Sequence, residues 1–257
     1  MLPSMSKRLV GVMAFETPTL PLVKVVRLLM PKRPWVQFSL GTMFIVVTAL
    51  CLVLVMVADR AHRQRDAIAA IEALGGNELF DLETYERRTT RFPGVLRQLL
   101  GPEYTDRVQS ITLSGTQVSD DSLTLLHDLP HLKSLSLRRT CVTDAGLAHI
   151  KGLSGLEHLL LDETQVTDAG LADLAGLSSL QELTLDGTKV GDSGLAHIQG
   201  LTRLQVLWLS LTQVTDEGMT HLAALKKLHT LSLSGTRVTP DGVVRLQRSL
   251  RNCEISR

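Results

Sequence analysis

Residues 132–155 read LKSLSLRRTCVTDAGLAHIKGLSG, and this stretch decides the fold. Its frame, LxxLxLxxTxVTDxGLxxL, returns every 24 residues without insertion or deletion. The valine of the VTD segment marks each copy and stands at Val118, Val142, Val166, Val190, Val214 and Val238. Self-similarity at a fixed period of 20–50 residues is typical of a solenoid, in which each unit stacks on the next. We therefore expect six stacked repeats within residues 108–257.

Each copy predicts a short strand followed by a turn and a short helix. Side chains alternate across a strand, so the two leucines of LxL point into the core and their neighbours point outward. The threonine after the strand, Thr140 in the quoted copy, is expected to bond the backbone of the neighbouring repeat. The helices begin at TD, and the aspartate at the first helical position favours the positive end of the helix dipole. The predicted N-caps are Ser119, Thr143, Thr167, Thr215 and Thr239.

Glycine recurs at fixed places in the repeat. Gly146 and its counterparts lie inside the predicted helices, where glycine costs roughly 1 kcal/mol against alanine. Their recurrence predicts close packing between neighbouring turns. Gly152, Gly176 and Gly200 follow the predicted helices and are interpreted as C′ residues.

The repeated frame resembles leucine-rich repeat proteins, whose consensus is LxxLxLxxN, with threonine here in place of asparagine. TxVTDxGLxxL looks like a subtype frequent in bacterial proteins and in the repeats of eukaryotic F-box adaptors. The segment FSLGTMFIVVTALCLVLV, followed by AIxALGG, is similar to bacterial membrane-anchored members. The resemblance implies an α/β horseshoe with a parallel sheet on the concave face and short helices on the convex face. It also implies a scaffold that binds partners, usually proteins, and it assigns no catalytic residue. No F-box precedes the repeats, so an adaptor function is not implied.

An apolar segment precedes the repeats. Residues 40–58 carry no charge, and the uncharged stretch extends back to residue 34. About 20 apolar residues suffice for a helix to cross the hydrocarbon of a bilayer. We therefore predict a transmembrane helix over residues 34–58, with a buried core helix or a cleaved signal peptide as alternatives. Basic residues slightly favour its N-terminal side, which predicts the repeats on the non-cytoplasmic side, periplasmic or extracellular.

The remaining segments frame these two parts. Residues 1–33 are basic and are expected to be disordered, and MPKRPW suggests that the biological start is Met30. Residues 59–107 predict a juxtamembrane helix, stopped at Gly75, and an N-terminal cap containing a strand in LFDLETYE and a helix between Pro93 and Gly101. At the other end RNCEISR predicts a truncated strand, with Ile255 pointing inward as a small C-terminal cap.

Composition excludes several classes of function. Residues 101–257 hold 14 Lys/Arg and 18 Asp/Glu, a net charge of −4, whereas residues 1–100 carry +5. An acidic repeat domain does not suit nucleic acid, which needs a basic stripe. The three cysteines show no CxxC and no paired spacing, so neither a disulfide framework nor a zinc site is indicated. No phosphate-binding loop, GxSxG, HExxH or kinase signature is present, and no cofactor is expected.

Function must therefore lie where the copies differ, on the outward positions of the strands. Around the middle of the array, successive copies carry basic, then acidic and then apolar side chains at these positions. Trp208 occupies a repeat position that holds Ser or Thr in most other copies. An exposed aromatic is a typical interface anchor, although Trp208 can also lie flat in a local apolar patch. The predicted partner-binding residues on the concave face are Trp208, Leu160, Val206, Leu211, Arg138, Asp162, Glu182 and Asp186.

Three other interpretations of the chain stay open. The carboxylates Asp162, Glu182 and Asp186 are either a solvated acidic face or a cation site. They are also the residues that a hydrolase would use. A row formed by His149, Asp173, His197 and His221 lies on the predicted helices, but ligands spread along a curve do not converge on a metal. Finally, such proteins can self-associate as a structural coat. The favoured interpretation is a non-catalytic scaffold that binds a protein or a surface glycan.

Overall fold

The computed structural model describes residues 40–79 and 108–257. The chain forms two compact units, Met1–Leu50 and Cys51–Arg257. The long helix α2, Leu40–Ala73, begins in the first unit and ends in the second. The predicted strand in LFDLETYE beyond Leu79, the predicted helix between Pro93 and Gly101, and residues 1–33 lie outside the described residues.

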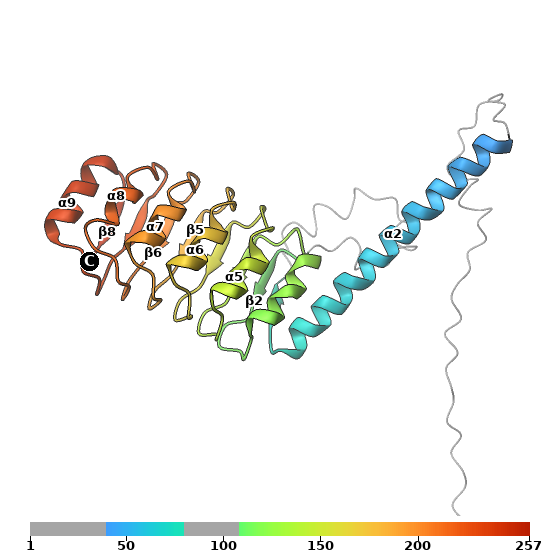
Figure 1. The fold of residues 1–257 in the computed structure, drawn as a ribbon, viewed down its shortest axis with the longest axis horizontal. Helices are drawn as coiled ribbons and strands as arrows, with labels where there is room; N and C mark the ends of the chain where they lie inside the picture. The colour runs from blue at the N-terminus through green and yellow to red at the C-terminus, as the bar shows by residue number, and fades with distance from the viewer. Residues whose placement is uncertain (1–39, 80–107) are drawn as a thin grey trace, which may run out of the picture. The chain divides into compact units, whose positions relative to one another are not determined.

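The second unit contains the repeats (Figure 1). Its strands are β1 (Asn77–Leu79), β2 (Ser110–Thr112), β3 (Ser134–Ser136), β4 (His158–Leu160), β5 (Glu182–Thr184), β6 (Val206–Trp208), β7 (Thr230–Ser232) and β8 (Glu254–Ser256). Its other helical elements are the 3₁₀ helix η2 (Asp120–Asp128) and the α-helices α5 (Asp144–Ile150), α6 (Asp168–Leu174), α7 (Asp192–Ile198), α8 (Met219–Leu222) and α9 (Pro240–Ser249).

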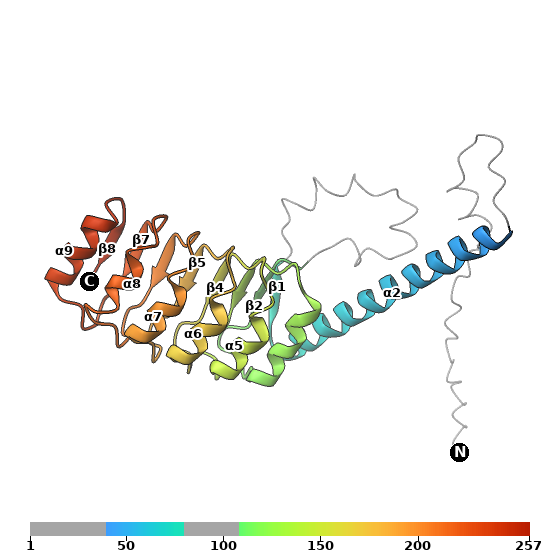
Figure 2. The same cartoon turned by 45° about the horizontal axis from the view of Figure 1, so that its top comes forward.

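The strands form one sheet in the order of the chain, β1 to β8. Strands β2 to β8 are parallel, and β1 pairs antiparallel with β2, so the first strand of the parallel array is covered. From β2 to β7, each strand pairs with the strand that lies 24 residues later, as in Leu135↔Leu159. The helices form a second row beside the sheet (Figures 1 and 2). This is the predicted parallel-sheet solenoid, and β8 is the predicted short strand at its end.

The core lies between the two rows and follows the LxL pattern. Both leucines of each copy are buried, for example Leu135 and Leu137, each 0% exposed. The helices add their own apolar residues, such as Leu147 and Ile150, also 0% exposed. Because each repeat contributes the same set, the core is a continuous stack of leucine layers that needs no large aromatic rings.

The threonine after each strand satisfies a carbonyl of its own repeat. Thr140 Oγ1 donates to the Leu137 carbonyl at 2.7 Å, and Thr188 Oγ1 donates to the Leu185 carbonyl at the same distance. Four of these threonines are buried. The expectation that they bond the neighbouring repeat was wrong, because the turn brings the carbonyl three residues earlier within reach of the hydroxyl.

The aspartate that opens each helix connects two repeats. Asp144 Oδ1 accepts the Thr167 backbone N–H at 2.8 Å, and Asp144 Oδ2 accepts the Thr167 hydroxyl at 2.6 Å. The same pair of bonds joins Asp120 to Thr143. The helix dipole, to which the repeat pattern assigns these aspartates, is therefore not their main interaction.

The N-cap residues of the helices agree with the predicted ones at most, but not all, positions. Thr143 and Thr167 accept the backbone N–H two residues later, and Thr239 accepts that of Gly242. Thr215 likewise accepts from Glu217, although α8 itself begins only at Met219. Ser119 is the N-cap residue of η2, as predicted, but its side chain makes no capping bond, and its hydroxyl lies 3.3 Å from that of Ser122.

The helix glycines are explained by the aspartates. A Cβ on Gly146 would lie 2.5 Å from Asp120 Oδ1, and one on Gly170 would collide with Asp144. Neighbouring turns therefore approach closely because a carboxylate occupies the space that a side chain would need. Gly152, in contrast, has open space around it.

Helix α2 combines an apolar segment with a packed end. Over Phe44–Ala73 it is long and apolar enough to cross a membrane by length and composition, and none of its most apolar part is buried. The same properties suit a signal sequence. Near its end, Ala67 and Ile71 are buried, and Ile68 and Leu74 pack against the repeat core. Gly75, with φ of +81°, follows the end of the helix, as the sequence predicts.

Candidate functional site

The outward face of the sheet carries the side chains that differ between repeats. Three positions of each copy point to this face, and the backbone pairing aligns them in rows that run across the strands. One row contains Ser136, Leu160, Thr184, Trp208 and Ser232. A second row lies just beyond the ends of the strands, at the residue that follows the second leucine of each LxL pair. It includes Arg138, Asp162, Asp186 and Ser210.

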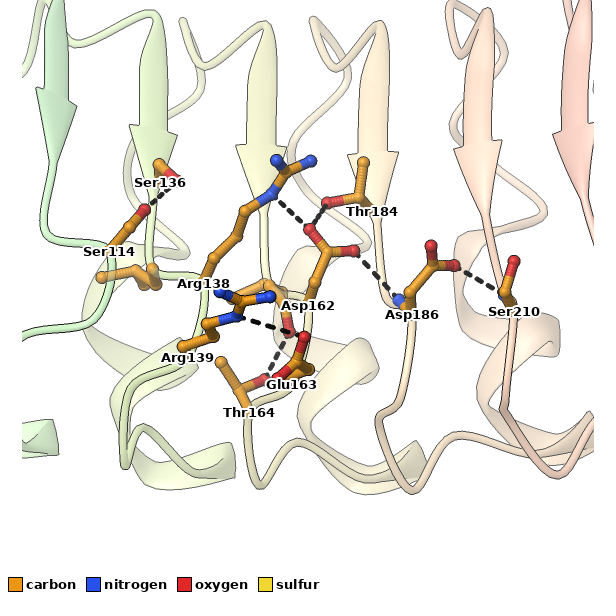
Figure 3. A network of polar contacts seen from close by, with 12 residues as sticks. Ser114, Ser136, Arg138, Arg139, Asp162, Glu163, Thr164, Thr184, Asp186 and Ser210 are labelled. Atoms are coloured by element: carbon orange, nitrogen blue, oxygen red, sulfur yellow. Dashed lines mark hydrogen bonds and ion pairs between the residues drawn. The ribbon is translucent and has the colours of Figure 1, made fainter.

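Arg138 and Asp162 form an ion pair across neighbouring repeats (Figure 3). The Asp162 carboxylate also accepts the Thr184 hydroxyl at 2.6 Å and the Asp186 backbone N–H at 3.1 Å. Asp162 is only 8% exposed and Thr184 is fully buried. Asp162 therefore differs from the solvated acidic residue that the sequence suggested: it is the buried centre of a polar network, and its charge is already countered.

Trp208 lies beside the guanidinium of Arg138. The Arg138 Cζ is 5.7 Å from the centroid of the Trp208 ring, within the range of a cation–π contact. Trp208 is on β6 and Arg138 follows β3, so the two side chains together reach across the strands between them, which are about 4.8 Å apart. Thr184 on β5 is 0% exposed, as a residue beneath this ring would be. Trp208 itself is half-buried. It is therefore held in place and still presents part of its surface.

Asp186 occupies the next step of the same row. Its Oδ1 accepts the Ser210 backbone N–H at 2.6 Å. Burial raises the pKa of the Asp186 carboxyl from its ordinary value of 3.8, the nearby Asp162 charge raises it further, and the hydrogen bond from Ser210 opposes this change. Asp186 remains partly exposed. It is thus a partly desolvated carboxylate beside Trp208.

A second polar pair occupies the start of the strands. His158 Nδ1 lies 2.9 Å from Glu182 Oε2, joining β4 to β5. The predicted residue Glu182 therefore has a partner on this face. Val206 follows in the same row, and both Leu160 and Val206 are half-buried. The structure brings all eight predicted residues onto one face, over strands β3 to β6 and the turns that follow them.

Leu211 follows β6 at a position with an uncommon backbone conformation. Its φ is +59°, and the equivalent residues of the other copies are also left-handed: Gly115, Arg139, Glu163, Gly187 and Gly235. Arg139 Nε bonds Glu163 Oε1 at 3.2 Å, which leaves Leu211 as an apolar side chain that is 70% exposed. No sequence signal reveals the conformation of Leu211 by itself, but the three glycines at the same repeat position indicate it.

Serine hydroxyls connect neighbouring repeats by hydrogen bonds at the two ends of this face. Ser114 Oγ lies 2.7 Å from Ser136 Oγ, and Ser210 Oγ lies 2.8 Å from Ser232 Oγ. Each pair joins residues 22 apart, as does the bond from Thr184 to Asp162. The sequence prediction does not include these contacts. Hydroxyl and carboxyl side chains that recur 22 residues apart would have indicated them.

Other titratable residues give no second site within the described ranges. No group of three or more His, Cys, Asp or Glu side chains there is placed to hold a metal ion. In the histidine row, His149 meets His127 edge to face, with ring centroids 5.9 Å apart. The chemistry of the outward face is that of a contact surface, with an aromatic ring, an exposed aliphatic side chain and carboxylates.

Comparison with known proteins agrees with the repeat fold. Residues 130–190 match the family described as Leucine rich repeat. Among solved structures, an internalin (inlF) from Listeria monocytogenes is 21% identical, with a TM-score of 0.45, and the match covers 63% of this chain and 53% of that one. The chain thus spans about half the length of that internalin.

Two further solved structures are similar over comparable stretches. An LRR protein of Leptospira interrogans is 26% identical, with a TM-score of 0.44, covering 52% of this chain and 33% of that one. Internalin C2 of Listeria monocytogenes is 25% identical, with a TM-score of 0.42, covering 59% and 75%. No curated protein sequence matches the chain.

Proposed function

We propose that the chain is a leucine-rich repeat protein that acts as a non-catalytic, membrane-tethered scaffold and binds a protein partner on the outward face of its sheet. One observation carries the proposal. Trp208 is held beside the Arg138 guanidinium and remains partly exposed, and Leu211, three residues later, is exposed. Aromatic and arginine side chains that are fixed before binding are typical anchors of protein interfaces.

The rest of the repeat supports this location by elimination. The leucines fill the core, the threonines satisfy turn carbonyls, and the aspartates at the helix starts connect neighbouring repeats. These positions have structural roles in every copy. The outward positions of the strands do not, so side-chain chemistry there is available for recognition.

Helix α2 supports the tether. Its apolar part is unburied and long enough to cross a bilayer, where a helix satisfies its own backbone. Its last turns pack against the repeat core, so the span would pass directly into the repeat domain. The basic residues before the span favour the N-terminus inside, which puts the repeats on the non-cytoplasmic side.

The carboxylates argue against a hydrolase. Asp162 is buried and ion-paired with Arg138, and Glu182 is bonded to His158. A pair of catalytic carboxylates needs room between them for the scissile bond and an attacking water. Asp162 has neither exposure nor a free charge to offer.

The test is capture of the partner by site-specific crosslinking in native membranes. A photo-crosslinking residue at Ser234, which is exposed after β7, should link one foreign protein, while the same residue at His197, exposed on α7, should not. Linkage from both positions, or from neither, contradicts the proposal.

Trp208→Ala supplies the second measurement. We expect the substitution to leave the fold intact and to weaken partner capture at least about tenfold, as loss of an aromatic anchor does. The matched control is Val244→Ala, because Val244 is a large apolar residue, 53% exposed, on α9. Unchanged capture by the Trp208 variant would show that the ring is only a local packing residue.

A further inference from the structure

Charge is divided unevenly along the array of repeats. Residues 108–198 carry 5 Lys/Arg and 12 Asp/Glu, a net charge of −7, whereas residues 199–257 carry 8 Lys/Arg and 4 Asp/Glu, a net charge of +4. Many of the acids bond neighbouring repeats, as Asp144 bonds Thr167. Of the eight bases in the last part, only Arg245 forms an ion pair with an acidic side chain of the described residues. The bases are therefore the charges that remain available there.

Three of these bases form a row along one edge of the array, here named the basic ladder. Arg203, Lys227 and Arg251 each stand three residues before a strand, β6, β7 and β8 respectively, and all three are exposed. Because β2 to β8 are parallel, the connections from helix to strand all lie at the edge where the strands begin. The ladder therefore occupies neighbouring repeats at this edge, on strands about 4.8 Å apart.

Two further bases flank the basic ladder. Lys226 precedes Lys227, and its Nζ donates to the Ser249 carbonyl at 3.3 Å, which places it against the end of α9. Arg248 lies in the last turn of α9 and is exposed. No Asp or Glu occurs in the three connections of this edge, residues 199–205, 223–229 and 250–253. This edge of the last repeats thus carries five bases and no acid in its connections.

The fold explains the two flanking bases but not the ladder. A base in the last turn of a helix stabilises its C-terminal end, as Arg248 does for α9, and Lys226 bonds a carbonyl of the same end. Arg203 and Lys227 lie five residues beyond the last residues of α7 and α8, and the dipole effect falls off within the last turn. Within the described part of the chain, no side chain of the ladder forms a hydrogen bond or an ion pair. Like charges on neighbouring repeats repel each other, so the ladder does not stabilise the fold.

The surroundings of the ladder indicate which kind of anion it fits. The three connections contain no Phe, Tyr or Trp, so they offer no platform on which the bases of a single-stranded nucleic acid could stack. Their leucines are buried, for example Leu204 and Leu228, so only charged and small polar groups reach the solvent. A group of four to eight Lys/Arg near a membrane is typical of a site for anionic lipid headgroups. The apolar part of α2, which is unburied and long enough to cross a bilayer, would keep such a surface within reach.

We propose that the basic ladder, together with Lys226 and Arg248, binds the anionic headgroups of a lipid bilayer. The ammonium and guanidinium groups contact the headgroup phosphates and do not enter the hydrocarbon, because no exposed apolar side chain accompanies them. This inference rests on the membrane tether of the proposed function. It assigns a role to the edge where the strands begin and leaves the outward face of the sheet to the protein partner.

Vesicle flotation tests the binding. The full chain in nanodiscs of neutral phosphatidylcholine is mixed with separate vesicles of phosphatidylcholine, with or without added phosphatidylglycerol. We expect capture only by the vesicles that contain phosphatidylglycerol, and a loss of capture as the salt concentration rises. Equal capture by both kinds of vesicle, or by neither, overturns the inference. Tighter binding of duplex DNA than of these vesicles overturns it as well.

Two double variants with the same change of charge locate the contact. Lys227→Gln with Arg251→Gln should weaken capture at least about tenfold, because each base near an anionic surface adds to the binding. Lys189→Gln with Arg237→Gln removes the same charge from exposed residues of the opposite edge, after the strands, and should leave capture unchanged. Exchanging the two types of base, Lys227→Arg with Arg251→Lys, should preserve it. Equal losses from both edges contradict the inference, and thermal unfolding verifies the fold of each variant.

The outcomes separate this inference from the proposed function. If the vesicles are not captured but Cys51 stays protected in membranes from an impermeant maleimide, the tether stands and the role of the ladder is wrong. Labelling of Cys51 in membranes contradicts the tether itself, whatever the vesicles do. Crosslinking from Ser234 tests the partner-binding face independently of both.

Discussion

At the residue scale, Leu211 illustrates the conflict between stability and recognition. Its backbone position is left-handed in every copy from Gly115 to Gly235, and glycine occupies three of the six. Forcing a residue with a Cβ into this region costs roughly 1–2 kcal/mol. Leu211 recovers little of that cost by burial, because it is 70% exposed.

We therefore predict that Leu211→Gly stabilises the folded chain. Relief of the left-handed strain should outweigh the larger entropy of glycine in the unfolded chain, for a net gain of about 0.5–1 kcal/mol. Urea unfolding of the detergent-solubilised chain, followed by circular dichroism, measures it. The reciprocal control is Gly115→Ala, whose Cβ would meet nothing within 4 Å at a φ of +71°, so any loss of stability reports the backbone alone. A destabilised Leu211→Gly would show that the side chain is a packing residue.

The polar residues of the outward face divide in the same way. Asp162 is buried, ion-paired and bonded, and removing its partner would leave an uncompensated charge. Asp186 differs by one detail: its diagonal neighbour is Trp208 instead of a threonine. Asp186 also accepts the Ser210 backbone N–H but, unlike Asp162, remains partly exposed.

At the scale of elements, the ladder of aspartates joins one helix start to the next. Asp144 accepts both the backbone N–H and the hydroxyl of Thr167, and Asp216 does the same for Thr239 and also pairs with Arg245 at 2.6 Å. Hydrogen bonds from Thr239, first the hydroxyl and then the backbone, hold the pKa of Asp216 below its ordinary value. These carboxylates stabilise the array by fixing one repeat on another.

Asp144→Ala tests this connection. Loss of the acceptor leaves the Thr167 N–H and hydroxyl without their partner, so we expect a loss of about 1–3 kcal/mol in the free energy of unfolding. A role in the helix dipole alone would cost only about 0.3–1 kcal/mol. The matched control is Asp241→Ala, because Asp241 lies in the first turn of α9 and is exposed. Equal, small effects of the two substitutions in urea unfolding would refute the connection.

At the scale of the whole molecule, the three cysteines report the relation of the chain to the membrane. Cys141 is exposed in the repeats, Cys253 is buried, and Cys51 is exposed on α2. Burial raises the pKa of Cys253 to about 11, with a smaller contribution from Glu254, so its thiolate is scarce at neutral pH. If α2 crosses the bilayer, lipid covers Cys51 as well.

We predict that a polar, membrane-impermeant maleimide labels one cysteine per folded chain, Cys141, and does so from outside intact cells. Mass spectrometry of the labelled peptides identifies the site, and Cys141→Ser should abolish labelling. Labelling of Cys51 in membranes would contradict the span. Labelling of Cys141 only after lysis would instead place the repeats inside.

The repeat fold, its register and its core follow from the amino-acid pattern alone. A 24-residue period with leucines at alternating positions leaves one arrangement in which every copy buries the same face, so Leu135 and Leu159 had to stack. Six copies of one pattern also reveal their helix starts, because Thr143 and Thr167 occupy equivalent places. These features follow from local periodicity, which is visible in the amino-acid sequence.

The side-chain contacts between copies, in contrast, depend on tertiary packing. Asp144 reaches the next repeat, Asp162 is buried and bonded to Arg138 and Thr184, and the Trp208 ring lies within cation–π distance of Arg138. The direction and length of each side chain decide these contacts. A side chain can bond the residue 22, 23 or 24 positions later, and the repeat pattern does not say which. A repeat pattern gives each residue its place in the stack, whereas the side chains packed around that place decide whether its charge or ring stays open to a partner.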